Sequence, residues 1–559
     1  MISGSLSGVW DNIKRDTARR LSAASALVTG QGSKIVLSDN TVKLLESVIK
    51  PYDIVNLEGN NQKQADFLAR CLCKVDPSVV HDLHMVQSVI ALPEHIEVFE
   101  RGIAQKLDFS FSGPQAGKVA ELINSGNIEL GAIHTYLELY GRYFVDLTPR
   151  VALVAAVQAD RDGNLYTGFS TEDTPVIVEA TKFKQGIVIA QVNQIVDKLP
   201  RIDIPGDWVD FIVQSPEPFY IEPLFTRNPA LITEAQILRG MMAIKGIYAE
   251  YAVKTLNHGI GFDTAAIELL LPTYAESLGL KGKICTHFVL NPHPTLIPAI
   301  ETGWVQSVHC FGGELGMEDY VAARSDIFFN GPDGSMRSNR AFSQVAGHYA
   351  TDMFIGGTLQ IDKWGNSSTA TAKRVSGFGG APNMGCDPKG RRHASEAWMQ
   401  CGAEDVGISK NIGPLHRGKK LVVQLAETFR EKMASCFVNE LDAVALSQNA
   451  HLTIEPIMIY GDDLTHIVTE EGIAYLHKCH DIEERMAAIR GVAGFTDIGL
   501  SADPDETAKL RELGVIKTPE DLGINITQAN KSMLAAQSIR ELVKWSHGLY
   551  QPPKQFRTW

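Results

Sequence analysis

Two stretches of the chain show an apolar run of strand length that ends in the sequence Asp-x-x-Gly-Asn. The first occupies residues 151–164 and the second occupies residues 354–366. Glycine and asparagine accept the positive φ of a tight turn more readily than other residues do. The pattern therefore predicts, twice, an apolar strand that is followed by a tight turn.

Each stretch also has a second set of signals upstream, where a short turn leads into a helical pattern. In the first half, an apolar strand pattern at 54–57 precedes a polar turn and a helix over 64–69. In the second half, a turn at 257–261 precedes a helix over 264–270. Strands that alternate with helices predict open, largely parallel sheets that are covered by helices.

The two sets of signals have the same spacing along the chain. Gly59 and Gly261 lie 202 residues apart, and Asp160 and Asp362 also lie 202 residues apart. Either turn alone is common, but two signals at one offset indicate an internal duplication. We therefore expect an α/β fold of two related open α/β halves with mostly parallel sheets.

The two halves are expected to join near residue 230. A Thr-x-x-Gln pattern at 233–236 predicts a capping box, in which the Thr hydroxyl accepts a hydrogen bond from a backbone N–H at the start of a helix. The predicted domains are residues 1–230 and 231–559. In the second domain, Thr-Pro-Glu-Asp at 518–521 predicts a helix start, and apolar residues at helical spacing over 526–545 predict a helical C-terminal extension.

The composition limits the classes of function. A length of 559 residues agrees with two domains, and a net charge of −13 argues against nucleic acid or anionic membranes as partners. No stretch approaches the roughly 20 continuous apolar residues that span a bilayer, and the N-terminus lacks the pattern of a secretory signal. Eight cysteines are too few for a disulfide framework in this chain, so we expect a cytoplasmic protein with reduced thiols.

The strongest local signal for a binding site is the glycine-rich segment 376–383, which follows the second repeat. Its Gly377, Gly379 and Gly380 let a ligand approach the backbone closely and turn peptide N–H groups toward an anion, and Asn383 closes the segment. A tight turn between a strand and a helix explains the same pattern about as well. The spacing is not that of a dinucleotide-binding loop.

A second candidate is the turn Gly259-Ile260-Gly261, which follows a predicted strand and begins a helix. Ligands of open α/β sheets bind at the carboxyl ends of strands, and a helix N-terminus favours negative charge. A glycine turn that the fold itself requires is slightly favoured. We interpret His258 as a polar capping residue rather than as a catalyst.

A third candidate is the polar segment after the first strand. Glu58, Asn60, Asn61 and Lys63 follow apolar residues directly, and the side-chain amides together with Lys63 are suited to binding a thioester oxygen, a carboxylate or a phosphate. The alternative is a solvated start of a helix with Asn as its cap. We favour the binding role, because polar amides gather at the carboxyl end of the strand.

Other polar patterns carry weaker signals. The segment 337–340, Arg-Ser-Asn-Arg, is suited to holding a dicarboxylate, although a solvated surface loop is the favoured interpretation. His81 with His84 and His477 with His480 are metal-ligand types, but neither pair has a second pair at a zinc spacing. We therefore predict no metal site.

The order of these motifs resembles that of coenzyme A transferases. In that order come Gly259-Ile260-Gly261, the strand that ends in the turn at 362–366, the segment 377–381, and Val-Thr-Glu within 467–476. Within this superfamily, the chain is similar over nearly its full length to the alpha subunits of malonate decarboxylase. The segments 57–68 and 376–384 are the most specific to that family.

The resemblance implies an enzyme that exchanges an acetyl thioester on an acyl-carrier (delta) subunit for malonate and releases acetate. Decarboxylase (beta and gamma) subunits would then act on the malonyl group. The cofactor implied is coenzyme A, or a dephospho-coenzyme A derivative attached to the carrier, and homo-oligomers remain open. The alternatives are a citrate lyase-type alpha subunit, an acetyl-coenzyme A hydrolase, and a non-enzymatic subunit that binds coenzyme A or the carrier.

The site is expected between the halves, with Asn60 and Asn61 facing Gly379 and Gly380. These amides and backbone N–H groups are candidate donors to the oxyanion that forms when a carboxylate attacks a thioester. Holding the reactants in position is worth roughly 7–11 kcal/mol, and one oxyanion donor is worth about 3–4 kcal/mol. Glu58 is a further candidate, so the predicted catalytic residues are Asn60, Asn61 and Glu58.

A carboxylate nucleophile is missing where the resemblance places one. Many coenzyme A transferases form a glutamyl thioester, and the corresponding position falls on Leu290, beside Asn291. No Asp or Glu occurs from 283 through 300. We therefore expect direct transfer between thioester and acid, with Glu58 and Glu314 as the remaining substitutes for the missing glutamate.

Overall fold

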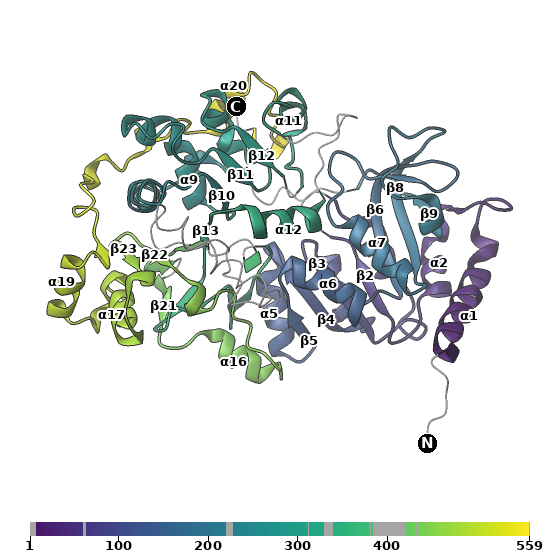
Figure 1. The fold of residues 1–559 in the computed structure, drawn as a ribbon. Coiled ribbons are helices and arrows are strands. Elements are labelled where there is room, and N and C mark those ends of the chain that lie inside the picture. Colours follow the sequence, from purple (N-terminus) through teal and green to yellow (C-terminus); the bar gives the residue numbers. More distant parts are fainter. Residues whose placement is uncertain are drawn as a thin grey trace.

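The computed structural model describes residues 7–59, 63–219, 227–310, 312–328, 339–380, 382–383, 420–430 and 433–557. Two large sheets organise it, one in each half of the sequence (Figure 1). No helix in these ranges is long and apolar enough to cross a membrane. Because the first sheet uses residues 35–214 and the second uses 255–517, the predicted boundary near 230 falls between them, although it stays a prediction.

The first sheet is parallel throughout its main path. Its spatial order is β1 (Ile35–Val36), β9 (Phe211–Gln214), β8 (Ile187–Ile195), β6 (Val151–Ala159), β2 (Ile54–Leu57), β3 (Leu83–Val89), β4 (Ala104–Phe111) and β5 (Glu129–Ile133). The short β7 (Leu165–Tyr166) pairs antiparallel with β6. The helices of this half are α1 (Ser7–Ala24), α2 (Thr41–Val48), α3 (Asp66–Leu72), α4 (Glu94–Glu100), α5 (Ala116–Asn124), α6 (Tyr136–Val145) and α7 (Thr174–Phe183).

The second sheet repeats this arrangement and adds an antiparallel edge. Its order is β12 (Ser307–His309), β11 (His287–Val289), β10 (Thr255–His258), β13 (Met353–Gly357), β18 (Leu421–Leu425), β22 (His466–Val468), β23 (Ile473–Tyr475) and β24 (Ile516–Lys517). Only the last two strands run antiparallel to their neighbours. Small paired strands lie beside it: β14 (Gln360–Asp362), β15 (Ser367–Ser368), β16 (Ala370–Thr371), β17 (Arg374–Val375), β19 (Phe429–Arg430), β20 (Ala434–Ser435) and β21 (Phe437–Val438).

The helices of the second half cover its sheet and fill the space between the halves. They are α8 (Glu234–Ala243), α9 (Phe262–Leu270), α10 (Ile297–Glu301), α11 (Glu318–Ala323), α12 (Arg340–Ala350), α16 (Asp442–Asn449), α17 (Ile482–Val492), α18 (Asp497–Leu500), α19 (Pro504–Glu512) and α20 (Ile539–Trp545). The predicted capping box is present at the start of α8. Helix α12 runs between the two halves, where it packs against α6 of the first half and near β10 of the second (Figure 1).

The two Asp-x-x-Gly-Asn turns confirm the internal duplication at the level of single hydrogen bonds. Asp160 accepts from the backbone N–H of Asn164 at 2.9 Å, and the Asn164 amide donates to the second Asp160 oxygen at 2.8 Å. The corresponding distances between Asp362 and Asn366 are both 2.9 Å. The strand order β8-β6-β2-β3-β4 also matches β18-β13-β10-β11-β12. The predicted fold class is therefore confirmed.

The register of the sheets corrects one detail of the repeat. Buried Asn56 of β2 donates to the Val86 carbonyl at 3.0 Å, and Asn257 of β10 donates to the Val289 carbonyl at 2.6 Å. These matched asparagines lie 201 residues apart, not 202. When the two sheets are aligned by strand register, Glu58 corresponds to Gly259, so Gly59 does not correspond to Gly261. The equal spacing of these two glycines in the sequence is therefore partly a coincidence.

The halves are joined by backbone pairing between the end of β4 and the segment after β17. The N–H of Ser112 donates to the Ser376 carbonyl at 2.9 Å, and the N–H of Phe378 donates to the Ser110 carbonyl at 2.7 Å. Buried Val375 and Phe378 belong to the same apolar cluster as the core of the first half. The hydrophobic core therefore continues from one half into the other.

The C-terminal region is less helical than its apolar spacing predicted. The turn at 518–521 begins no α-helix, and the expected helix over 526–545 is reduced to α20. The side chains of Asn525, Asn530 and Ser538 each accept a backbone N–H two or three residues ahead. Local caps of this kind compete with continuous helix, and they divide the segment into short turns.

The junction between the halves makes Gly377 intolerant of a side chain. Its φ is +77°, and a Cβ would lie 2.3 Å from the Ser110 carbonyl oxygen. Gly377→Ala should therefore lower the free energy of unfolding by more than about 1 kcal/mol, as measured by urea denaturation. Gly117→Ala is the control, because a Cβ there meets no atom closer than 4.0 Å and helix α5 favours Ala. Equal stability of the two variants would contradict this account of the junction.

Candidate functional site

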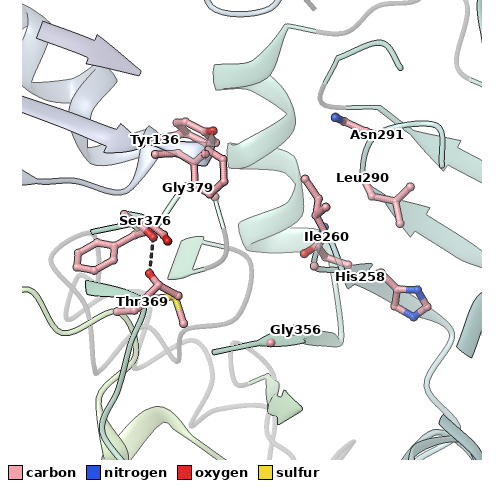
Figure 2. Close-up of a pocket in the computed structure, with 18 of the residues that line it drawn as sticks. Tyr136, His258, Ile260, Leu290, Asn291, Gly356, Thr369, Ser376 and Gly379 are labelled. Carbon is pink, nitrogen blue, oxygen red and sulfur yellow. Dashed lines mark hydrogen bonds between the residues drawn. The ribbon is translucent and has the colours of Figure 1, made fainter. Parts of the chain in front are cut away.

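A cavity of about 430 Å³ lies where the two halves meet. Parallel strands of the second sheet deliver Ile260, Leu290, Asn291 and Gly356 to it at or just beyond their carboxyl ends, and the first half contributes Tyr136. Figure 2 shows Tyr136 on one side, with Ile260, Leu290 and Asn291 opposite. Its volume falls in the range of small-molecule sites.

The glycine-rich segment forms one wall of the cavity, and part of it also joins the halves. Gly377 and Gly379 line the cavity. The Gly379 N–H donates to the Ser110 carbonyl at 3.0 Å, and its carbonyl accepts from the N–H of Tyr136 at 3.0 Å. This N–H, expected as an oxyanion donor, is thus engaged in the junction.

Gly380 is the more exposed of the two expected backbone donors toward a ligand. It lines the cavity, and within the described ranges its N–H has no hydrogen-bond partner. A Cβ at Gly380 would lie 2.3 Å from Nε2 of Gln344, so a larger residue here would require the Gln344 amide to move. Asn383 is buried and does not line the cavity, and its backbone N–H donates to the Gly380 carbonyl at 3.1 Å.

The second predicted glycine turn reaches the cavity through Gly259 but not through Gly261. The Gly259 N–H donates to the Ile355 carbonyl at 2.7 Å, and a Cβ there would lie 2.9 Å from Cα of Gly356. The glycine is therefore required by close strand packing, which was the favoured interpretation. Gly261 is the N-cap of α9 and faces open space.

A buried carboxylate, Glu268, organises the side chains behind this wall. It accepts hydrogen bonds from Arg227 at 3.0 Å and from Nδ1 of His258 at 2.9 Å, and it lies 2.9 Å from Nδ1 of His293. Burial opposes its charge, but Arg227 and the two histidines hold the pKa of Glu268 well below its usual range. The interpretation of His258 as a helix cap is wrong, since its ring lies in this network.

The two histidines are held neutral and both line the cavity. Burial, with smaller contributions from Arg227, lowers the pKa of His258 and lowers that of His293 to about 4. The Nε2 atom of His258 is 2.9 Å from the Tyr248 hydroxyl. The wall therefore presents uncharged imidazoles above an ionised, fully buried carboxylate.

The predicted catalytic loop is only partly described. Asn60 and Asn61 lie outside the described residues, so their position relative to Gly379 and Gly380 stays a prediction. Glu58 does not line the cavity. It is fully buried and accepts from the Ala155 N–H at 2.8 Å.

Glu58 is paired rather than free. Its Oε1 accepts from the Thr174 hydroxyl at 2.5 Å and lies 3.4 Å from Nζ of Lys63. Burial raises the pKa of Glu58 to about 7 despite the nearby Lys63. The alternative of an Asn-capped helix start is wrong, because the N-cap of α3 is Ala65, without a side-chain hydrogen bond.

Arg340 overturns the interpretation of its segment as a solvated loop. It begins α12, is 4 % exposed and lines the cavity. Its Nη2 lies 2.6 Å from the Glu172 carboxylate, and its guanidinium lies 4.7 Å from the centre of the Tyr136 ring. Arg337 and Ser338 lie outside the described residues.

The described lining contains no Asp, Glu, Cys or Lys. Leu290 and Asn291, where the resemblance places a nucleophilic glutamate, both face the cavity. Glu314 is buried elsewhere, and burial raises its pKa to about 8. In the described ranges no cluster of three His, Cys, Asp or Glu side chains is placed to hold a metal ion.

Sequence reasoning missed Gln344, His293 and Tyr136 as lining residues. Their sequence surroundings carry no motif, and an isolated Gln on a helix is usually solvated. The one available signal was the spacing of Arg340 and Gln344, because residues four apart are neighbours if the segment is helical, but this spacing does not indicate burial.

Two facing α/β halves with matched strand order and a cavity at their strand ends define a coenzyme A transferase-type protein. In fold the chain is similar to the putative alpha subunit of citrate lyase from Streptococcus mutans. The TM-score is 0.59 at 14% identity, covering 94% of this chain and 88% of that one.

The family model described as malonate decarboxylase, alpha subunit, transporter matches residues 9–559. The chain therefore belongs to the family of malonate decarboxylase alpha subunits, as its motifs predicted. It is 67% identical over 551 residues to the acetyl-S-ACP:malonate ACP transferase of Malonomonas rubra, covering 99% of both chains. It is also 58% identical, with a TM-score of 0.92, to a chain in a structure of a Pseudomonas malonate decarboxylase hetero-tetramer in complex with malonate, covering 98% of this chain and 99% of that one.

The depressed pKa of His293 predicts acid sensitivity of the cavity wall. An unfolded histidine has a pKa of about 6.5, whereas His293 in the folded chain has a pKa of about 4. The unfolded chain therefore binds the proton first, so stability is full above about pH 6.5 and is lost as the pH falls toward 4. At pH 5 the loss from this residue should be on the order of 2 kcal/mol.

Urea denaturation at pH 7.5 and pH 5 measures this loss. The difference in the free energy of unfolding between pH 7.5 and pH 5 should be smaller for His293→Asn than for the wild-type chain, by about 2 kcal/mol. His480→Asn is the control, because its side chain is 82% exposed and it should keep the wild-type difference. An unchanged pH difference in His293→Asn would show that this imidazole is not held neutral.

Proposed function

We propose that the chain is an acyl-thioester transferase that exchanges acetyl for malonyl on an acyl-carrier subunit, or on coenzyme A, as the alpha subunit of a biotin-independent malonate decarboxylase. The observation that carries the proposal is the cavity between the halves, which combines a buried arginine with a described lining free of carboxylates. Such a lining suits an anionic acid as the attacking group. The 67% identity to an acetyl-S-ACP:malonate ACP transferase supports the choice of acids.

The reaction balances without a group from the protein. One carboxylate oxygen of malonate attacks the acetyl carbonyl carbon and the C–S bond breaks. The thiolate departs, and a mixed anhydride of acetate and malonate remains. The thiolate then attacks the malonyl carbonyl carbon, the C–O bond breaks, and acetate leaves. Both steps pass through an oxyanion, so the protein contributes position and hydrogen-bond donors.

The candidate donors come from both halves. Asn291 faces the cavity and makes no side-chain hydrogen bond within the described ranges, and the Gly380 N–H also has no partner there. Asn60 and Asn61 remain proposed donors from the first half. Glu58, which anchors the base of their loop through Lys63, is proposed to hold that loop in place.

The cavity also suits the thioester arm of a carrier. Gly259, Gly356 and Gly377 line its walls, and Phe378 adds an apolar surface, so the thioester arm is proposed to lie between them. A dephospho-coenzyme A derivative on a delta subunit would supply the acyl group as a thioester. The hetero-tetramer of the Pseudomonas relative supports partner subunits, for which we propose the decarboxylating beta and gamma subunits.

Isotope exchange tests the function. Purified chain incubated with acetyl-coenzyme A and labelled malonate should form labelled malonyl-coenzyme A and release acetate. If labelled citrate but not labelled malonate transfers label to coenzyme A, the chain is a citrate lyase-type subunit. Release of free coenzyme A thiol without labelled product would indicate a hydrolase, and no turnover would indicate a binding subunit.

The donor role of Asn291 gives a second measurement in this assay. Asn291→Ala should lower kcat about 10²-fold or more, since one oxyanion donor contributes at that scale. Asn449→Ala is the control, because Asn449 is an exposed residue at the end of α16. Exchange by Asn291→Ala at the wild-type rate would remove Asn291 from the proposed mechanism.

Direct transfer predicts that no acyl-enzyme forms. After incubation with acetyl-coenzyme A alone, borohydride reduction or hydroxylamine trapping should leave every Glu unmodified by peptide mass mapping, and Glu314→Gln should retain exchange. A modified Glu at any position would refute direct transfer.

A further inference from the structure

Two polar side chains of the cavity have buried atoms that find no hydrogen-bond partner among the described residues. Gln344 is fully buried, and neither its Nε2 nor its Oε1 is bonded. Arg340 is 4 % exposed, and its Nε and Nη1 have no partner. Buried polar groups are almost always paired, because each unpaired group costs about 1–3 kcal/mol. Both residues line the cavity, so a ligand there is the available partner.

The two side chains lie on one face of α12, four residues and about one turn apart. Asn339 caps this helix by accepting from the Phe342 N–H at 3.1 Å. The helix packs against α6 of the first half and near β10 of the second. The pair is therefore presented to the cavity from a helix held by both halves.

The Arg340 guanidinium is oriented before any ligand binds. Its Nη2 lies 2.6 Å from the Glu172 carboxylate, and the ring of Tyr136 lies beneath it. Its backbone N–H also donates to the Glu172 carbonyl at 3.1 Å. Fixing the group in advance lowers the entropy cost of binding an anion. Among the described lining, the other arginine is Arg374, which is exposed.

We infer that Arg340 and Gln344 bind the second carboxylate of the incoming dicarboxylic acid, the one that does not become acylated. The inference rests on the proposed transferase function. During exchange one carboxylate of malonate reacts while the other stays anionic, and acetate has no such group. Arg340 pairs with this negative charge, and the Gln344 amide donates a second hydrogen bond to the same carboxylate. The pair thus selects the dicarboxylate over the monocarboxylate.

The test compares two acids in one chain. Labelled malonate measures transfer to the dicarboxylate, and labelled acetate measures self-exchange with acetyl-coenzyme A, which needs the same chemistry but no second carboxylate. Gln344→Leu and Arg340→Gln should each lower kcat/KM for malonate at least about tenfold, mainly by raising KM, because hydrogen bonds to a charged group are lost. Acetate self-exchange should fall much less than transfer to malonate, because acetate has no second carboxylate to lose a partner.

Controls separate binding from folding. Arg19→Gln is the matched control, since this α1 side chain is 79% exposed and does not line the cavity. Arg340→Gln leaves Glu172 buried without its cation, so the double variant Arg340→Gln with Glu172→Gln removes both charges. Malonamate, in which one carboxylate is a neutral amide, should be a poor acceptor for the wild-type chain. Arg340→Gln should narrow the preference for malonate over malonamate at least about tenfold.

The outcomes are distinct. If the wild-type chain exchanges acetate but not malonate, the proposed function fails and the inference fails with it. If the wild-type chain exchanges malonate, but Gln344→Leu and the double variant keep their kcat/KM for malonate, only the inference is overturned. An equal loss of malonate and acetate exchange also overturns it, because that loss marks a role in folding or chemistry. A selective loss of malonate exchange, with a narrowed preference over malonamate, supports it.

Discussion

The backbone pairing between the end of β4 and the segment after β17 is the contact on which the site depends. Through it Ser110 and Ser112 of the first half hold Ser376 and Phe378 of the second. Together with the packing of α12 against α6 and the hydrogen bond between Tyr136 and Gly379, this pairing brings the two halves together around the cavity. The same backbone contact requires a glycine at 377, because a side chain would displace Ser110. The glycine-rich segment is therefore a structural joint and a wall of the cavity at once.

Buried charges on the two sides of the cavity make it receptive to anions. Arg227 compensates the charge of Glu268, and burial together with Arg227 lowers the pKa of the neighbouring His258 and His293. Glu172 orients Arg340, which lines the cavity and whose Nε and Nη1 have no hydrogen-bond partner within the described ranges. The described lining holds no carboxylate to repel or replace an incoming acid. These features agree with a reaction between two substrates that the protein positions and does not join covalently.

The fold class was predictable because its signals are local. A strand followed by Asp-x-x-Gly-Asn repeats because the Asp carboxylate, the Asn amide and the turn glycine form hydrogen bonds within five residues. The capping box at 233–236 is local in the same sense. The prediction of a continuous C-terminal helix was wrong for a related reason. Apolar spacing predicted the helix, but closely spaced Asn and Ser side chains cap short turns instead.

By itself the sequence determined the duplicated α/β halves, the glycine turns and the missing glutamate at Leu290. Tertiary structure alone decided the burial of Arg340, the place of Gln344 in the cavity lining and the role of His258 beside Glu268. Arg340 lies 168 residues from its partner Glu172 in the sequence. The residues next to an arginine in the sequence do not distinguish a solvated arginine from a buried one. Burial and pairing depend on which distant strands and helices meet, and the sequence pattern of a single segment does not contain that information.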